Sequence, residues 1–152
     1  MGLRGRVLGL TVTGTLLAVL SAGCGGGDAL SKKQYVSQLN AMCEDFSARE
    51  KKIGEPQTVR DLAEIGPRVL DAFEQAIADK VRNLKAPDEV ADQADRLVEL
   101  ADEQRDVLAD LVDAAKAKDV AKVNELVSKN ETLNEEANSL TRKLGAQACA
   151  EK

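Results

Sequence analysis

The sequence predicts an all-α protein folded as an antiparallel four-helix bundle. Residues of high helix propensity, mainly alanine, leucine, glutamate and lysine, dominate the chain, and only three of its 152 residues are aromatic. After Gly27, glycine and proline occur only at a few positions, which separate four amphipathic segments. No run alternates β-branched and polar residues between turn signals, so strands have little support.

The first helix is expected to begin after Ser31 and to end at Gly54. Ser31 and Gln34 have the spacing of a capping box, in which each side chain accepts a hydrogen bond from the other residue's backbone N–H. Leu30 and Tyr35 can form the accompanying hydrophobic staple. The apolar residues that follow recur at helical spacing along one face: Tyr35, Val36, Leu39, Met42, Cys43, Phe46 and Ile53.

The second helix is expected to be capped by Thr58 and to extend to Leu84. Its apolar stripe consists of Val59, Leu62, Ile65, Val69, Leu70, Phe73, Ile77, Val81 and Leu84. The pair Gly66-Pro67 falls inside this stripe. Because proline removes a backbone hydrogen bond and clashes with the preceding turn, we expect a kink or a short break there, as an adjustment of shape.

Pro87 is expected in the first turn of the third helix, and Asp119 is expected to cap the fourth. Glu125 and Lys129 have the spacing of a favourable ion pair on the outer surface of the fourth helix. The apolar stripe of the third helix is Val90, Ala94, Leu97, Val98, Ala101, Leu108, Leu111, Val112 and Ala115. That of the fourth is Val120, Val123, Leu126, Val127, Leu133, Ala137, Leu140, Leu144 and Ala148.

Short links between the helices favour antiparallel neighbours, which bring the end of the fourth helix back beside the first. Cys43 and Cys149 would meet there, and we expect them to form a disulfide across 106 positions of sequence. Closing a loop of that length is worth up to about 4.7 kcal/mol. The alternative is two buried free thiols.

The N-terminal segment has the pattern of a secretory signal peptide. Arg4 and Arg6 precede an apolar stretch over residues 7–20, and small residues follow up to Cys24. A membrane-spanning helix needs about 20 apolar residues, so this shorter stretch favours cleavage over retention.

The residues Leu20-Ser21-Ala22-Gly23-Cys24 resemble the lipobox of bacterial lipoproteins. The resemblance implies that Cys24 carries a thioether-linked diacylglycerol and becomes the first residue of the mature protein. Ser21 stands where that family prefers leucine, and Leu20 lies one place earlier. Lipidation of Cys24 would also explain the odd number of cysteines. The alternative is ordinary secretion, with cleavage near Ala22 or Gly23 and a free Cys24.

The sequence therefore divides into a cleaved signal peptide (1–23), a lipidated cysteine with a glycine-rich tether (24–30) and a helical domain (31–152). Removing residues 1–23 takes away two arginines and no acidic residue, so the formal charge changes from −5 to −7. We expect an extracytoplasmic domain anchored to the cell membrane by its lipid. Its acidic charge, without a basic patch, argues against binding to nucleic acid.

Both ends of the mature domain resemble a group of small exported helical proteins from actinobacteria. The residues concerned are Leu30-Ser31-Lys32, Tyr35-Val36, Leu39-Asn40 and Cys43 at one end, and Leu144-Gly145 and Cys149 at the other. The resemblance implies a helical domain tied by a disulfide, and it implies no activity.

No catalytic or metal-binding pattern stands out, so we expect neither enzymatic activity nor a cofactor. The chain lacks histidine, the commonest general base and metal ligand. It has no phosphate-binding glycine loop and no nucleophile elbow. Three polar residues, Asn40, Gln104 and Asn130, fall near the apolar stripes. They are expected to fix the register of the core, and the alternative is that they line a ligand cavity.

Two functions are consistent with these features. The preferred hypothesis is a structural or interaction module that binds another protein of the cell envelope, and its expected sign is an exposed apolar patch. The alternative is a carrier that holds a small apolar ligand inside the bundle. The expected sign of a carrier is a sizeable internal cavity. The scarcity of aromatic residues argues against a haem or an aromatic ligand.

Overall fold

The computed structural model describes residues 30–150, which form helices and no strands. The helices are α1 (Lys32–Ile53), α2 (Val59–Phe73), α3 (Asp79–Asn83), α4 (Ala91–Lys116), α5 (Val120–Leu144) and α6 (Gln147–Ala150). A π-helical turn, η1 (Glu74–Ala78), joins α2 to α3, and a 3-10 turn, η2 (Asp88–Val90), precedes α4. The predicted signal peptide, and Cys24 with most of its tether, lie outside the described residues. Among the helices described, none is long and apolar enough to cross a bilayer.

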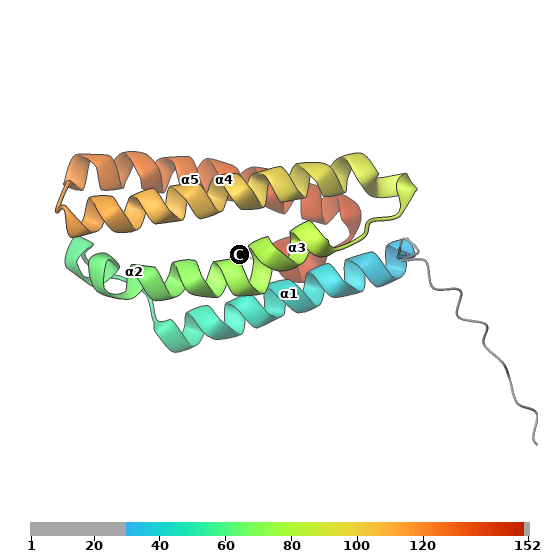
Figure 1. Ribbon diagram of the computed structural model, residues 1–152, viewed down its shortest axis with the longest axis horizontal. Helices are drawn as coiled ribbons and strands as arrows, with labels where there is room; N and C mark the ends of the chain where they lie inside the picture. Colours follow the sequence, from blue (N-terminus) through green and yellow to red (C-terminus); the bar gives the residue numbers. More distant parts are fainter. Residues whose placement is uncertain (1–29, 151–152) are drawn as a thin grey trace, which may run out of the picture.

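The predicted antiparallel four-helix bundle is confirmed, with α1, α2–α3, α4 and α5 as its long members (Figure 1). Helix α1 packs against α2 and η1, α2 packs against α4, and α4 packs against α5. The fourth side of the bundle is different, because the short helix α6 packs against both α5 and α1. Helix α6 thus joins two helices that make little direct contact with each other.

Three of the four predicted helix starts, those at Ser31, Thr58 and Asp119, are confirmed by their hydrogen bonds. The backbone N–H of Ser31 donates to the Gln34 side chain at 3.0 Å, and the Gln34 N–H donates to the Ser31 hydroxyl at 3.4 Å. The side chains of Thr58 and Asp119 accept the N–H groups of Asp61 and Lys122 at 3.1 and 3.0 Å. These caps satisfy backbone donors that have no partner within the first helical turn.

The sequence predicted a kink or a short break at Gly66-Pro67, and no break occurs, because α2 continues through both residues. Figure 1 shows the first turns of α2 at an angle to the rest, so the helix bends without ending. Gly66 has a packing role. A Cβ atom at this position would lie 2.8 Å from Cγ2 of Val112, so glycine permits the close approach of α2 and α4. The irregular turn of this segment is η1 instead, beginning seven residues after Pro67.

Two smaller predictions also need correction. Pro87 has an extended backbone (ψ 152°) and lies just before η2, so the third helix begins with a 3-10 turn after the proline. Glu125 pairs with Lys122 at 2.8 Å rather than with Lys129. Both pairings are on the exposed surface, where an ion pair contributes little to stability.

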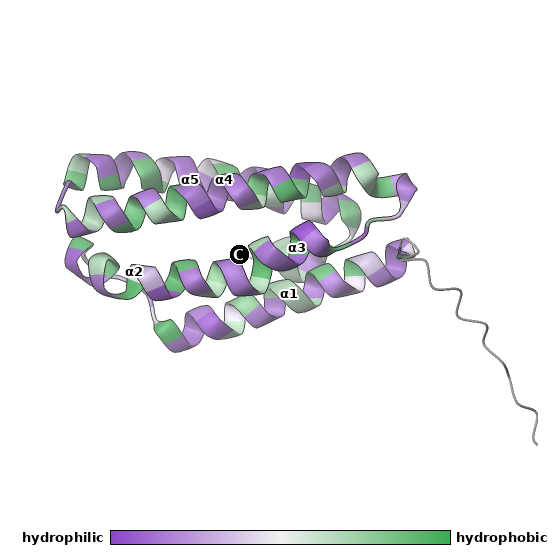
Figure 2. Ribbon diagram, viewed as in Figure 1, coloured by the Kyte–Doolittle hydropathy of each residue, from purple (hydrophilic) through white to green (hydrophobic). Residues whose placement is uncertain are grey.

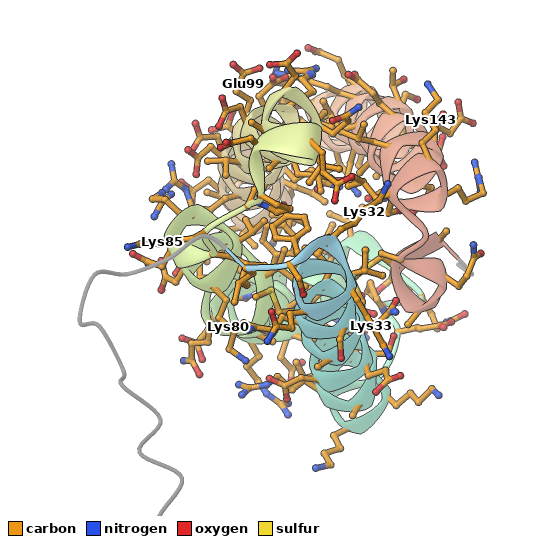
Figure 3. All side chains as sticks on the ribbon, turned by 90° about the vertical axis from the view of Figure 1, so that its right-hand side faces the viewer. Lys32, Lys33, Lys80, Lys85, Glu99 and Lys143 are labelled. Atoms are coloured by element: carbon orange, nitrogen blue, oxygen red, sulfur yellow. A yellow bond between two sulfur atoms is a disulfide. The ribbon has the colours of Figure 1, made fainter. Side chains whose placement is uncertain are left out.

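The buried residues form two clusters, which we call the first core and the second core. The first core gathers residues of every long helix, of η1 and η2 and of the turn after α5: Tyr35, Leu39, Met42, Phe73, Ala78, Val81, Val90, Ala94, Leu97, Ala101, Leu144 and Ala146. The second core lies between α4 and α5: Leu100, Val107, Leu111, Ala114, Ala115, Val123, Leu126 and Leu133. Apolar and polar residues recur along every long helix (Figure 2), as expected of amphipathic helices. The charged side chains of Lys80, Lys85, Glu99 and Lys143 point away from the bundle (Figure 3).

A candidate ligand cavity between α1 and α5

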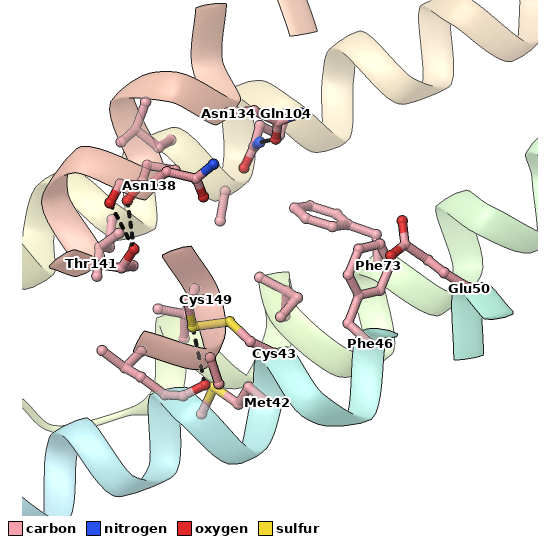
Figure 4. A pocket seen from close by; sticks show the side chains of 18 residues that line it. Met42, Cys43, Phe46, Glu50, Phe73, Gln104, Asn134, Asn138, Thr141 and Cys149 are labelled. Atoms are coloured by element: carbon pink, nitrogen blue, oxygen red, sulfur yellow. Dashed lines mark hydrogen bonds between the residues drawn. A yellow bond between two sulfur atoms is a disulfide. The ribbon is translucent and has the colours of Figure 1, made fainter. Parts of the chain in front are cut away.

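A cavity of about 270 Å³, partly open to solvent, lies between α1 and α5 beside α6, which packs against both helices. Every long helix contributes to its wall, so the cavity is a property of the whole fold (Figure 4). Its apolar lining consists of Leu39, Met42, Phe46, Phe73, Ile77, Val81, Leu97, Leu100, Ala101, Ala137, Ala148 and the two cysteines. The remaining lining residues are Glu50, Gln104, Asn134, Asn138 and Thr141.

The disulfide forms one side of this cavity. Cys43 and Cys149 are bonded as predicted, with their Cα atoms 5.1 Å apart. The bond joins α1 to α6, a helix of four residues that is too short to be stable alone. The side chain of Asn40 also holds α6, because its Oδ1 atom accepts the N–H of Ala148 at 3.0 Å. Asn40 therefore has the structural role that the sequence suggested.

The aromatic side of the cavity is formed by both phenylalanines of the chain. Phe46 of α1 and Phe73 of α2 meet edge to face, with their ring centroids 5.5 Å apart. Such a pair presents a rigid apolar surface that loses little side-chain entropy when a ligand binds. The scarcity of aromatic residues had argued against an aromatic ligand, but the fold gathers two of the three at one site.

The opposite side is polar and comes mainly from α5. Asn134, Asn138 and Thr141 follow one another at helical spacing and face the cavity (Figure 4). From α4, the amide of Gln104, which is 8% exposed, donates a hydrogen bond to the side-chain oxygen of Asn134. The Thr141 hydroxyl is within bonding distance of the backbone carbonyls of Ala137 (3.0 Å) and Asn138 (3.2 Å).

Glu50 is the one ionisable residue in the lining, and no lysine or arginine is present there. Asp45, also on α1, is not part of the cavity lining, and its ion pair with Lys80 connects α1 to α3. Hydrogen bonds from Arg49 (3.1 Å) and Lys80 (3.0 Å) hold the pKa of its carboxyl below the usual range. Within residues 30–150, no three histidine, cysteine, aspartate or glutamate side chains gather in a way that could hold a metal ion.

A second, wider hollow of about 760 Å³ lies at the other end of α1. Leu62, Val69 and Leu111 contribute to its lining, and charged residues, including Lys51 and Glu55, also line it. Asn130 lines this hollow, whereas Gln104 lines the cavity beside the disulfide. The three polar residues singled out in the sequence therefore lie at three different places.

Sequence reasoning missed the polar side of α5. Asn134, Asn138 and Thr141 each directly follow a residue of the apolar stripe, namely Leu133, Ala137 and Leu140. A row of neutral polar residues beside an apolar stripe, repeated over three successive turns, is a signal that could have indicated them. Comparison with known protein families, characterised proteins and solved structures gave no match.

Proposed function

We propose that the protein is an extracytoplasmic, lipid-anchored carrier that binds a small, mainly apolar ligand in the cavity between α1 and α5. The observation that carries this proposal is the cavity itself. Its volume of about 270 Å³ lies just below the range of small-molecule sites, which begins at roughly 300 Å³, so it suits a small ligand. Water inside such an apolar lining makes few hydrogen bonds, so an apolar group gains affinity by displacing it.

The interaction module remains a hypothesis with less support. Its expected sign was a contiguous exposed apolar patch. In the described part of the chain, the large apolar residues that are exposed are Val120 and Val127, at 54% and 39%. Both belong to α5, and single exposed valines are common on soluble proteins. We therefore favour the carrier over the interaction module.

Ligand binding can be tested with the neutral fluorophore N-phenyl-1-naphthylamine. We expect its fluorescence to rise on titration with the protein, and we expect Ala137→Phe, which fills the cavity, to abolish the rise. Ala121→Phe is the matched control, because it makes the same change on the exposed face of α5. Circular dichroism should show that both variants are folded. Absence of binding by the unaltered protein, or equal binding by both variants, would contradict the proposal.

The anchor is tested separately by the mass of the protein purified from its own membranes. A chain beginning at Cys24, with added acyl groups, would support the proposed lipidation. A chain that begins elsewhere and carries no lipid would rule it out, whatever the result of the ligand titration.

A further inference from the structure

We infer that the ligand is an amphiphile with an uncharged hydrogen-bonding head group, such as a hydroxyl, which Asn138 binds. This inference rests on the proposed carrier function and specifies the chemistry of the ligand. It follows from the hydrogen bonds already made along the cavity, from the charges near it and from the arrangement of its two sides.

The hydrogen bonds along α5 leave the amide of Asn138 accessible and without a partner among residues 30–150. The Gln104 amide bonds to Asn134, and the Thr141 hydroxyl lies against backbone carbonyls. The Asn138 side chain is half-buried and lines the cavity, yet it forms no hydrogen bond with any residue of the described range. A primary amide has two donor hydrogens and an acceptor oxygen. Asn138 can therefore both donate to and accept from a hydroxyl group.

The charges near the cavity disfavour an anionic head group. No lysine or arginine lines the cavity, and the ionisable residue that does, Glu50, carries a negative charge when ionised. A carboxylate moved from water into this site would lose its hydration without gaining a cation, which costs far more than burying a hydroxyl that is hydrogen-bonded. A fatty acid is therefore a poorer ligand than the alcohol of equal length.

The two sides of the cavity determine how such a ligand would lie. Asn138 and Thr141 project from α5, whereas the rings of Phe46 and Phe73 lie across the cavity on α1 and α2 (Figure 4). An amphiphile placed with its head toward Asn138 has its hydrocarbon part against the phenylalanine rings and the disulfide. The opposite orientation would put hydrocarbon against an unpaired amide.

The test compares 1-octanol, n-octane and octanoate as competitors of N-phenyl-1-naphthylamine, with the unaltered protein and with Asn138→Leu. Because one neutral hydrogen bond is worth about 1 kcal/mol, we expect the variant to bind 1-octanol roughly fivefold to tenfold more weakly. Its affinity for n-octane should be unchanged or higher. Asn138→Ala removes the same amide with a residue of high helix propensity and guards against misfolding of the leucine variant. Asn124→Leu, on the exposed face of α5, is the matched control.

Two results would overturn the inference while leaving the carrier function standing. One is tighter binding of octanoate than of 1-octanol at neutral pH. The other is a change of affinity that is the same for 1-octanol as for n-octane, in both Asn138→Leu and Asn138→Ala. If neither the fluorophore nor any octyl compound binds the unaltered protein, the carrier function and this inference fail together.

Discussion

The first and second cores differ in composition and in packing. The second core contains only leucine, valine and alanine, and it lies between α4 and α5, which are consecutive in the chain. The first core combines residues of every long helix, and it contains the buried aromatic residues Tyr35 and Phe73. The cavity, the disulfide and the π-helical turn all occur on the side of the first core. The cavity occurs where the short helix α6, instead of a long helix contact, joins α5 to α1.

The comparison suggests a division of roles. Helices α4 and α5 form a hairpin of consecutive helices against which α2 packs, and this hairpin presents Gln104, Asn134 and Asn138 on one side. The first core depends on a contact between residues 106 positions apart. Stability of the first core should therefore respond most to loss of the disulfide.

Loss of the disulfide is expected to have the largest effect. Cys149→Ser should lower the free energy of unfolding by up to about 4.7 kcal/mol, because a loop of about 100 residues is no longer closed in the unfolded chain. It should also weaken binding of the fluorophore, because α6 loses its covalent link to α1. Thermal unfolding followed by circular dichroism measures the first effect.

The control for this prediction is the double variant Cys43→Ser/Cys149→Ser. It should be no less stable than either single variant, because the two cysteines make one bond. Reductant should lower the melting temperature of the unaltered protein and not that of the double variant. An unchanged melting temperature in Cys149→Ser would show that the bond contributes nothing to stability.

Enlarging an alanine should have opposite effects in the two regions. Ala115 is 1% exposed in the second core, so Ala115→Leu should overpack it and lower the free energy of unfolding by about 1–3 kcal/mol. Ala137 lines the cavity, so the larger side chain of Ala137→Leu has space there. This substitution should raise the free energy of unfolding by roughly 0.5–2 kcal/mol. Urea denaturation of both variants makes the comparison. Equal destabilisation would mean that the cavity is not available to a side chain.

The sequence predicted more of the first core than of the second. The predicted stripes include every first-core residue except Ala78 and Ala146, but they omit Leu100, Val107 and Ala114 of the second core. Val120 and Val127, which the stripe of the fourth helix includes, are exposed. The caps at Ser31, Thr58 and Asp119 were also predictable, since they depend only on residues three positions apart.

The cavity could not be predicted, because its lining comes from every long helix and its volume depends on how they pack. Phe46 and Phe73 read equally well as ordinary core residues, and only the fold places them against one another. At Gly66-Pro67 the sequence predicted a kink or a short break, and the helix bends without breaking (Figure 1). The local rule for proline allows either outcome, so it could not decide between them.

The smallest expected effect is the change in the pKa of Tyr35 between the folded and unfolded protein. This change tests whether water is excluded from the part of the first core around Tyr35. Burial raises the pKa of its phenol above the ordinary value of 10.0, and the nearby negative charge of Asp95 adds to the shift. Because the chain has one tyrosine and no tryptophan, the absorbance change of tyrosinate reports this group alone. The folded protein should titrate at higher pH than the protein in concentrated urea.

The stability consequence has a definite sign. Below pH 10 the phenol is protonated in both states and contributes no pH dependence. Above pH 10 the unfolded chain loses this proton first, so the free energy of unfolding falls as the pH rises toward the folded-state pKa. Tyr35→Phe should show a shallower decline over the same range, because the variant has no phenol to titrate. The unaltered protein and Tyr35→Phe could instead lose stability equally steeply with pH, and the phenol could titrate at the same pH in the folded and denatured protein. Those two results together would mean that water reaches Tyr35 in the folded protein.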